Sequence, residues 1–347
     1  MKKLYALLFV PFCAFAQLPD YFEYYEGVDL TLTGNALKEQ LATLVTQTHT
    51  TELTYTPDVW TALEAADLDP DNPENVFLIY GYDDTDADTN NDRTRDKDDN
   101  CHTLSCSGLW VREHVFPRSL GNPNLEYAGP GADAHHLRAI DANMNSSRSN
   151  RRFADGSGHA TTITGGFFYP GDEWRGDIAR MMMYMYVRYG TQCEANVVGS
   201  GSSSYSPMTD MPNIFLEWNQ EDPVSQYEKN RNTILQDMQG NRNPFIDNPY
   251  LATLIWNGPA AEDTWQELGL NIKETSQIVI YPTINTGIVS IQNANIEYSI
   301  RVVNPLGQRV SHKLQDNVID ITGNAPGIYL IELSDKAHIE VFKVILQ

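Results

Sequence analysis

The chain has 347 residues, of which 41% are hydrophobic and 20% are charged, and its formal net charge is −22. This length predicts two domains, each able to bury a core. So negative a charge excludes a protein that binds nucleic acid over its whole surface, because such binding depends on Lys and Arg that neutralise phosphates. After residue 16 the sequence has no apolar run of the roughly 18 residues that a membrane span requires, so we expect no transmembrane segment.

The N-terminus has the features of a secretory signal peptide. Two lysines precede an apolar run over residues 4–15, and Ala-Phe-Ala at 14–16 is a small-x-small pattern that signal peptidases cut. We expect residues 1–16 to be removed and the mature chain to begin at Gln17. The protein would then be secreted or lie at the cell surface.

Three cysteines remain in the mature chain. In an oxidising compartment Cys101 and Cys106 could close a small loop, which leaves Cys193 as a single thiol. A zinc site is disfavoured, because no C-x-x-C pair or matching histidine spacing accompanies these cysteines.

In chain order, the first predicted elements are two helices. Leu37 and Leu41 recur at helical spacing, and Pro57 begins a second helix that runs through Leu63. The apolar run at 76–80 predicts a short buried strand.

Residues 83–100 are a polar loop in which aspartates at 84, 86 and 88 alternate as at the start of a calcium loop. Thr89 and Arg95 stand where that loop needs glycine and glutamate. We therefore favour a solvated loop, with a calcium site as the alternative.

Residues 110–116 alternate as a strand, which Pro117 ends. Apolar residues at 137, 140 and 144 then predict a helix, with Asp141, Asn145 and Arg148 on its polar face. Another helix is predicted at 175–189, and we interpret its methionines as core. From residue 271 the sequence changes to short β-rich runs that glycines and prolines separate, at 278–281, 288–291, 298–303, 318–321, 328–333 and 339–345.

The charge is distributed unevenly. Residues 112–190 hold nine arginines, no lysine and eight acids, so this region is slightly positive within an acidic chain. Surface ion pairs explain many single arginines, but the exclusive use of Arg suits bidentate contacts to phosphate. The pattern indicates a phosphate-facing groove.

Within this region lie the residue types that hydrolyse a phosphodiester, which requires a base to activate water and a cation to offset developing charge. His114 is the natural base, because imidazole accepts a proton near neutral pH. Glu113 and Asn145 supply hard oxygen ligands that suit Mg²⁺. Adjacent strand residues point to opposite faces, so the strand must end or bulge at 113–114 for Glu113 and His114 to share a site.

The segments "REHVFPRS" at 112–119 and "DAHHLRAIDANMNSSRSNRRF" at 133–153 resemble two blocks of the secreted bacterial endonuclease I family, and the segments at 175–190 and 239–249 are also similar to it. The resemblance covers roughly residues 27–258. It implies an α+β fold with a ββα-metal (His-Me finger) nuclease core in a largely helical domain. It also implies that His114 is the general base and that Glu113 and Asn145 bind one divalent ion, Mg²⁺ or else Ca²⁺ or Mn²⁺.

Some members of that family carry a longer insert with a phosphate-binding arginine, and only eighteen residues separate His114 from Asp133 here. For that role we favour Arg148 and then Arg138. Further candidates for contact with substrate phosphate are Arg112, Arg152, His135 and Asn150.

The β-rich tail resembles the C-terminal sorting domain of the type IX secretion system through "YPTINTG" at 281–287, "PGIYLIEL" at 326–333 and the ending "FKVILQ". Thr283 and Ile284 replace the usual Asn-Pro. The resemblance implies that the secretion machinery is a partner and that the tail, a small sandwich-like all-β domain, is removed. We thus expect a signal peptide at 1–16, a nuclease domain at 17–270 and a sorting domain at 271–347.

The sequence therefore predicts a secreted, metal-dependent endonuclease of low sequence specificity that acts on DNA, with RNA as a further candidate substrate. The family resemblance implies that it leaves 5′-phosphate ends. The main alternative is a non-catalytic surface adhesin or calcium-binding protein, which gives no reason for Glu113, His114 and Asn145 to occur together. Another exported hydrolase is disfavoured, because the chain has no G-x-S-x-G, H-E-x-x-H or Walker A motif. The oligomeric state is not readable.

Overall fold

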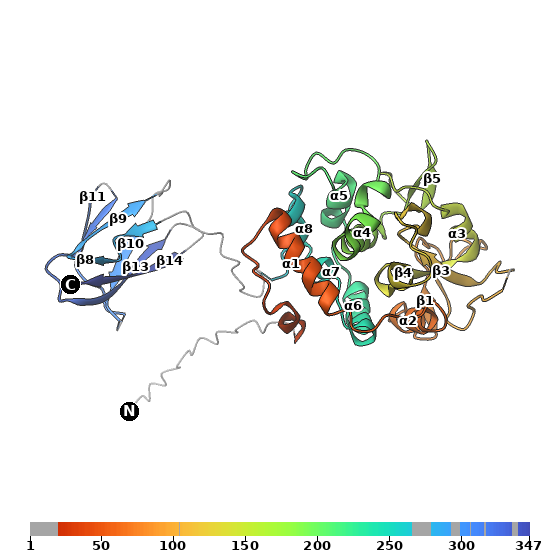
Figure 1. Cartoon of the computed structure of the whole chain (residues 1–347), viewed down its shortest axis with the longest axis horizontal. Helices are drawn as coiled ribbons and strands as arrows, with labels where there is room; N and C mark the ends of the chain where they lie inside the picture. Colours follow the sequence, from red (N-terminus) through yellow and green to blue (C-terminus); the bar gives the residue numbers. More distant parts are fainter. Residues whose placement is uncertain are drawn as a thin grey trace, which may run out of the picture. The chain divides into compact units, whose positions relative to one another are not determined.

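The computed structural model describes residues 20–103, 105–265, 279–292, 299–305, 307–315, 317–334 and 339–347. The chain divides into two units, Met1–Ile272 and Lys273–Gln347, which are described separately (Figure 1). The proposed signal peptide lies outside the described residues. Among the described residues, no helix combines the length and apolarity of a membrane span.

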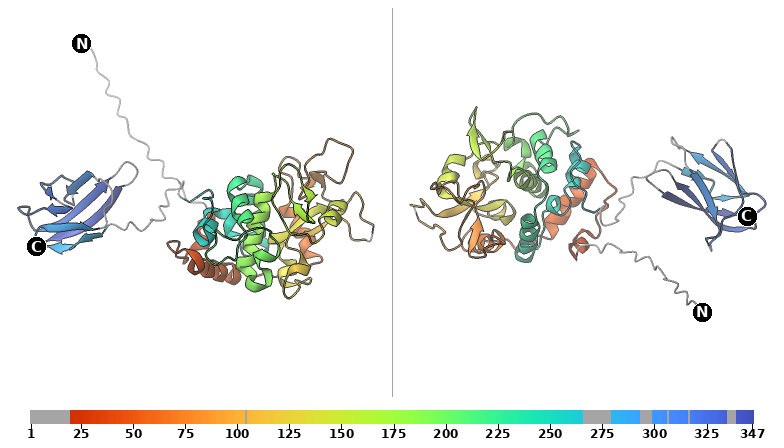
Figure 2. Two further views of the ribbon diagram at one scale, coloured as in Figure 1. Left: turned by 90° about the horizontal axis from the view of Figure 1, so that it is seen from above. Right: turned by 180° about the vertical axis from the view of Figure 1, so that it is seen from behind.

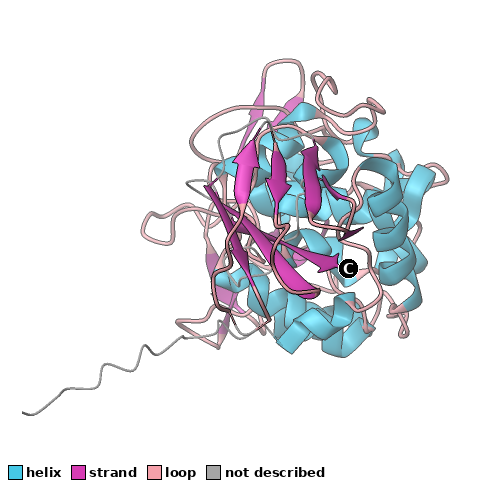
Figure 3. Cartoon of the chain, turned by 90° about the vertical axis from the view of Figure 1, so that its left-hand side faces the viewer, coloured by secondary structure: helices cyan, strands magenta, loops and turns pink. Residues whose placement is uncertain are grey.

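Most of the regular secondary structure in the described part of the first unit is helical (Figures 1 and 3). The longest helix, α4 (Arg175–Tyr189), packs against α1 (Gly34–Gln47), α5 (Asn213–Glu221) and α7 (Pro244–Asp247). The other helices of eight or more residues are α2 (Asp58–Ala66) and α6 (Gln226–Gln239), and α8 (Tyr250–Trp256) is shorter. Because neighbours surround α4, its methionines 181, 182, 183 and 185 are buried, which confirms their interpretation as core.

The helices predicted near residues 37, 57 and 175 are therefore confirmed. The strand predicted at 76–80 is shorter than expected: β1 (Asn75–Phe77) pairs with β2 (Thr94–Asp96), which lies inside the segment expected to be a loop. A further hairpin joins β5 (Thr161–Ile163) to β6 (Phe167–Tyr169).

The segment predicted as one helix from 137 to 148 is a strand followed by a helix, and the prediction was wrong for its first half. Strand β4 (Leu137–Asp141) pairs antiparallel with β3 (Trp110–His114), and α3 (Ala142–Arg148) follows it directly. Every residue of β4 is buried, so the strand lacks the polar–apolar alternation that would have identified it. The Asp141 carboxylate accepts the backbone N–H groups of Asn143 and Met144 and so begins the helix at its N-cap.

The cysteines and the aspartate-rich loop can be compared with their predictions. Cys101 and Cys106 form a disulfide, and Cys193 is a buried free thiol, both as expected. In the aspartate-rich loop, Asp84 accepts hydrogen bonds from the backbone of Arg93 and Thr94, and Asp86 and Asp88 accept others within the loop. Hydrogen bonds within the loop thus involve all three aspartates, and the calcium site stays a prediction.

The second unit consists of two four-stranded sheets around one apolar core, with its strands drawn in magenta in Figure 3. One sheet has the order β10-β13-β14-β8 and the other β11-β12-β9-β7. The strands are β7 (Val279–Tyr281), β8 (Ile284–Asn285), β9 (Ile288–Gln292), β10 (Ser299–Val303), β11 (Lys313–Gln315), β12 (Val318–Asp320), β13 (Gly327–Ser334) and β14 (Ile339–Leu346). All six predicted strands are present. The missed ones, β8 and β11, are two and three residues long, too short for a period-2 pattern.

Candidate active site

A pocket of about 230 Å³ opens where β3, the segment after it and α3 meet. It is lined by Arg112, Glu113, His114, Pro117, Arg118, Ser119, Asn145, Ser149 and Asn150. Both views of Figure 2 show this part of the first unit, in yellow, on the side away from α1. The structure thus brings together five residues predicted for the site: Arg112, Glu113, His114, Asn145 and Asn150.

Glu113 and His114 both line the pocket, and β3 ends at His114, although its ladder still pairs Glu113 with Arg138 and His114 with Leu137. The next residue, Val115, still donates its N–H to the carbonyl of His136, its partner in the same register. Pro117, which has no N–H to donate, follows two residues later.

The imidazole of His114 is held in one tautomer. Its Nε2 lies 2.9 Å from the carbonyl oxygen of Gly131, which can only accept, so Nε2 carries the proton. Burial, and then the neighbouring His136, lower the pKa of His114 from 6.5 to about 3. The ring is therefore neutral at physiological pH, with Nδ1 as its unprotonated nitrogen. On one side it stacks against Tyr55, with ring centroids 5.3 Å apart.

The Glu113 carboxylate is only 3% exposed. Its Oε1 accepts the hydroxyl of Tyr80 at 3.3 Å and lies 3.2 Å from Nε of Arg148. Burial raises the pKa of Glu113 from 4.5 to about 7, even though Arg148 and Tyr80 lower it. A buried carboxylate whose charge is so incompletely offset provides a favourable environment for a cation.

The donor set fits a hard divalent ion. Glu113 and Asn145 both line the pocket, and carboxylate and amide oxygens are the ligands that Mg²⁺ and Ca²⁺ prefer. Within the described residues no three His, Cys, Asp or Glu side chains gather closely enough to hold a metal. An ion at Glu113 and Asn145 would therefore keep several waters, as Mg²⁺ commonly does.

Arg148, our first candidate for phosphate contact, does not line the pocket. Its side chain is fully buried, and its two Nη atoms donate to the carbonyl oxygens of Val115 and Ser149, each at 2.7 Å. The guanidinium thus contacts the Glu113 carboxylate through Nε and the backbone at Val115 and Ser149 through its Nη atoms. Arg148 therefore lies behind Glu113, inside the protein, and not in the pocket.

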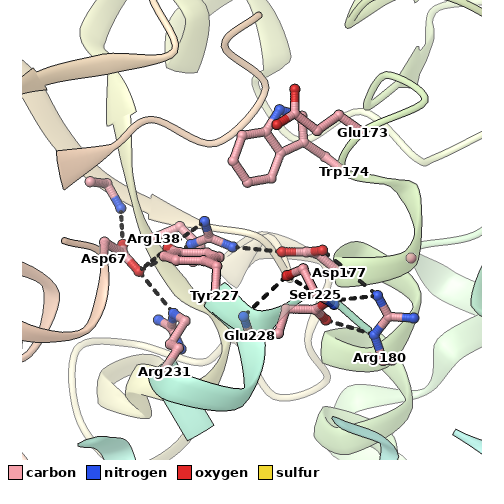
Figure 4. A network of polar contacts seen from close by, with 12 residues as sticks. Asp67, Arg138, Glu173, Trp174, Asp177, Arg180, Ser225, Tyr227, Glu228 and Arg231 are labelled. Atoms are coloured by element: carbon pink, nitrogen blue, oxygen red, sulfur yellow. Dashed lines mark hydrogen bonds and ion pairs between the residues drawn. The ribbon is translucent and has the colours of Figure 1, made fainter. Parts of the chain in front are cut away.

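Arg138, the second candidate, does not line the pocket and belongs to a buried polar network (Figure 4). Its guanidinium lies 3.2 Å from Asp67 and 3.3 Å from Asp177, and it donates to Tyr227 at 2.8 Å. Burial lowers the pKa of Arg138, but Tyr227, Asp67 and Asp177 together raise it above its usual value. The same buried network includes Arg180, Ser225, Glu228 and Arg231. Arg138 is the cross-strand partner of Glu113, but these buried partners occupy its guanidinium and it does not line the pocket.

Two further candidates also lie elsewhere. Arg152 donates to the backbone carbonyls of Asn196 and Gly199. His135 is buried, with Nε2 donating to the carbonyl of Asn241 at 3.1 Å, and burial lowers its pKa to about 4.

Sequence reasoning missed Arg118, Tyr80, Tyr55 and Tyr127, which surround Glu113 and His114. Arg118 belongs to the segment "REHVFPRS" and could have been chosen from it, since it lies four residues after His114. Tyr55 and Tyr127 had no such signal, because they come from loops far from His114 in sequence.

Comparisons with known proteins identify the family of each unit. Residues 33–250 match the family described as Endonuclease I, and residues 279–347 match the Secretion system C-terminal sorting domain. An extracellular ribonuclease of Bacillus amyloliquefaciens is 40% identical over 237 residues, which cover 65% of this chain and 75% of that protein. An extracellular ribonuclease of Bacillus subtilis (strain 168) is 39% identical over 246 residues, which cover 67% and 78%. The chain therefore belongs to the endonuclease I family of nucleases and ends in a secretion-system sorting domain.

Proposed function

We propose that this protein is a secreted, divalent-metal-dependent endonuclease with low sequence specificity, and that β3, β4 and α3 form its ββα-metal core. Residues 17–270 would be the nuclease domain. The observation that carries the proposal is the pocket that places the neutral imidazole of His114 beside Glu113 and Asn145. An adhesin would not require such an arrangement.

In the proposed reaction, Nδ1 of His114 accepts a proton from the attacking water. The Gly131 carbonyl holds Nε2–H and so keeps Nδ1 available. The negative charge of a bound phosphodiester raises the pKa of the imidazole and so favours proton transfer when substrate is present. Arg112 and Arg118, which line the pocket, would hold phosphate oxygens.

A divalent cation at Glu113 and Asn145 would offset the charge that develops on the phosphoryl group and the departing 3′-oxygen. Departure of that 3′-oxygen leaves 5′-phosphate ends. Arg148 and Tyr80 orient the Glu113 carboxylate from inside the protein.

The substrates would be DNA and RNA. Both relatives are named extracellular ribonucleases, which supports RNA as a substrate beside DNA. The proposed signal peptide at 1–16 and the type IX sorting domain at 271–347 would direct export, after which the tail is removed.

The test is cleavage of supercoiled plasmid and of RNA with Mg²⁺, with and without a chelator. We expect cleavage that the chelator abolishes and that His114→Ala reduces at least a hundredfold, because general-base catalysis contributes about 10²–10⁴-fold. His159→Ala is the matched control, since His159 is exposed and lies outside the pocket. Cleavage that persists in chelator would exclude the metal mechanism, and no cleavage with any cation would favour the adhesin.

A further inference from the structure

An exposed tyrosine stands beside the proposed base. Tyr127 is 55% exposed, and the only other exposed large apolar side chain in the described part of the first unit is Tyr205. The Tyr205 hydroxyl donates to Glu217. The Tyr127 ring lies 4.8 Å from the Tyr55 ring and 6.5 Å from His114, between centroids. Tyr127 therefore borders the site where the scissile phosphate would bind.

Arg118 joins this tyrosine to the pocket. Its guanidinium carbon lies 3.7 Å from the centroid of the Tyr127 ring. Its Nη1 is buried without a hydrogen-bond partner among the described residues, and the side chain lines the pocket with Glu113 and Asn145. A buried guanidinium N–H needs an acceptor, and a phosphate oxygen in the pocket would supply one.

The turn that carries Tyr127 also fixes the base. Glu126, the preceding residue, has a φ of 56°, an uncommon left-handed conformation for a residue other than glycine. Gly131 packs so closely that an added Cβ would lie 2.2 Å from the Glu126 carbonyl oxygen. The Gly131 carbonyl in turn accepts Nε2–H of His114. The backbone that presents Tyr127 to solvent thus also orients the imidazole.

We propose that Tyr127, supported by Arg118, is a stacking platform for an unpaired nucleobase next to the scissile phosphate, so that the enzyme prefers single-stranded nucleic acid. This inference rests on the proposed nuclease function and names its substrate class. Arg118 lies over the Tyr127 ring, yet more than half of Tyr127 remains exposed. Aromatic rings stack on any base, because every base has a π-face.

We expect a preference for single strands, because only an unpaired base exposes its π-face to the Tyr127 ring. Inside a duplex both faces of a base are stacked, and only its edges reach the grooves. A base must leave the stack before it can contact a protein ring, and this is easiest where it is already unpaired. A duplex can therefore bind through its phosphates without using Tyr127.

Binding tests the platform without turnover. Fluorescence anisotropy would compare a short oligothymidylate, an oligouridylate and the thymidylate paired with its complement, with full-length His114→Ala protein as the parent. We expect added Tyr127→Ala to weaken binding of both single strands about 5- to 100-fold and to change duplex binding little. Tyr127→Phe keeps the ring and should bind as the parent does, and Tyr205→Ala is the matched control for an exposed tyrosine.

Steady-state cleavage is the second test of the platform. With His114 intact, Tyr127→Ala should lower kcat/KM on the single strands and not on the duplex, mainly through KM. An abasic site beside the cleaved bond should reduce wild-type cleavage and add nothing to Tyr127→Ala. Equal loss on single strand and duplex, or no loss on either, overturns the platform. If wild type cuts nothing with Mg²⁺, the nuclease proposal fails, whereas the anisotropy result still decides whether the platform exists.

Discussion

Arg118 and Arg148 both lie near Glu113, but their surroundings differ in a way that separates substrate binding from structural support. Arg148 is fully buried, pairs with Glu113 and holds two backbone carbonyls. Arg118 lines the pocket and has a buried N–H without a partner among the described residues. One arginine serves the folded state, and the other is available to a ligand.

We expect Arg148→Ala to lower the free energy of unfolding by about 3–5 kcal/mol, because it leaves the buried Glu113 carboxylate unpaired. For a domain of this size that corresponds to a fall in Tm of about 10 °C. Thermal unfolding followed by circular dichroism measures it. An unchanged Tm would show that Glu113 does not depend on this pair.

For Arg118→Ala we expect the reverse outcome. Its Tm should stay close to that of the wild type, while kcat/KM falls about 10- to 100-fold through loss of a charged hydrogen bond to phosphate. Steady-state cleavage of RNA or plasmid measures this loss. Wild-type kcat/KM in the variant would leave Arg112 as the phosphate ligand.

At the scale of single elements, α3 carries Asn145 and depends on Asp141 for its start. One carboxylate oxygen of Asp141 caps α3, and the other accepts Arg95 Nη1 at 2.7 Å, a buried ion pair. Helix α3 has only seven residues, so little besides this cap and its packing holds it.

Asp141→Ala should therefore destabilise the protein more than Asp141→Asn, because asparagine is as good an N-cap as aspartate. Both substitutions remove the charge that faces Arg95, so their difference isolates the cap, at about 1 kcal/mol. Chemical denaturation gives the two free energies of unfolding, and a titration with Mg²⁺ shows whether Asn145 is displaced. Equal stabilities would mean that the cap contributes nothing.

The helices around α4 predict a pH effect through Asp222, at the end of α5. Burial raises the pKa of Asp222 from 3.8 to about 6, although Gly176 N–H and Arg180 lower it. The folded state then binds a proton more tightly than the unfolded state, so this carboxylate destabilises the protein increasingly as pH rises from about 4 to 6. Above pH 6 the full penalty remains.

Asp222→Asn should stabilise the protein at pH 7 by about 1–2 kcal/mol, after allowance for screening of a partly exposed group. The gain should disappear toward pH 4, where the wild-type carboxyl is protonated. Asparagine still offers an oxygen to the Gly176 N–H that Asp222 accepts. Urea unfolding across this pH range is the measurement, and a pH-independent difference would contradict the assignment.

Helices α1 and α4 could be predicted from sequence, because their apolar residues recur at helical spacing. The helices α5 to α8 at 213–256 and the hairpin β5–β6 were not predicted. The prediction failed at β4, because a strand buried on both faces has apolar residues without alternation, and their spacing at 137, 140 and 144 matches a helix. Glu113, His114 and Asn145 could be found because they lie in two compact segments. The roles of the arginines could not be predicted. The neighbours of Arg138, for example, depend on the register of β4, which the sequence does not give.

At the scale of the whole molecule, the arginines that make residues 112–190 positive occupy two different environments. Arg112 and Arg118 line the pocket, whereas Arg138, Arg148 and Arg180 are fully buried in ion pairs with acids. The expected phosphate-facing groove is thus confined to a few side chains. A small cationic site on an acidic protein limits nonproductive binding to polyanions.

The two units should be separable, because each has its own hydrophobic core, within residues 25–265 for the first and 280–346 for the second. A chain that ends at Ile272 should therefore keep the kcat/KM and the main unfolding transition of the full protein. Calorimetry of the full chain should show a second transition of about 50 kcal/mol, as expected for about 75 residues, and the truncation should remove it. Loss of activity together with the tail, or one shared transition, would mean that the nuclease unit needs the sorting domain to fold.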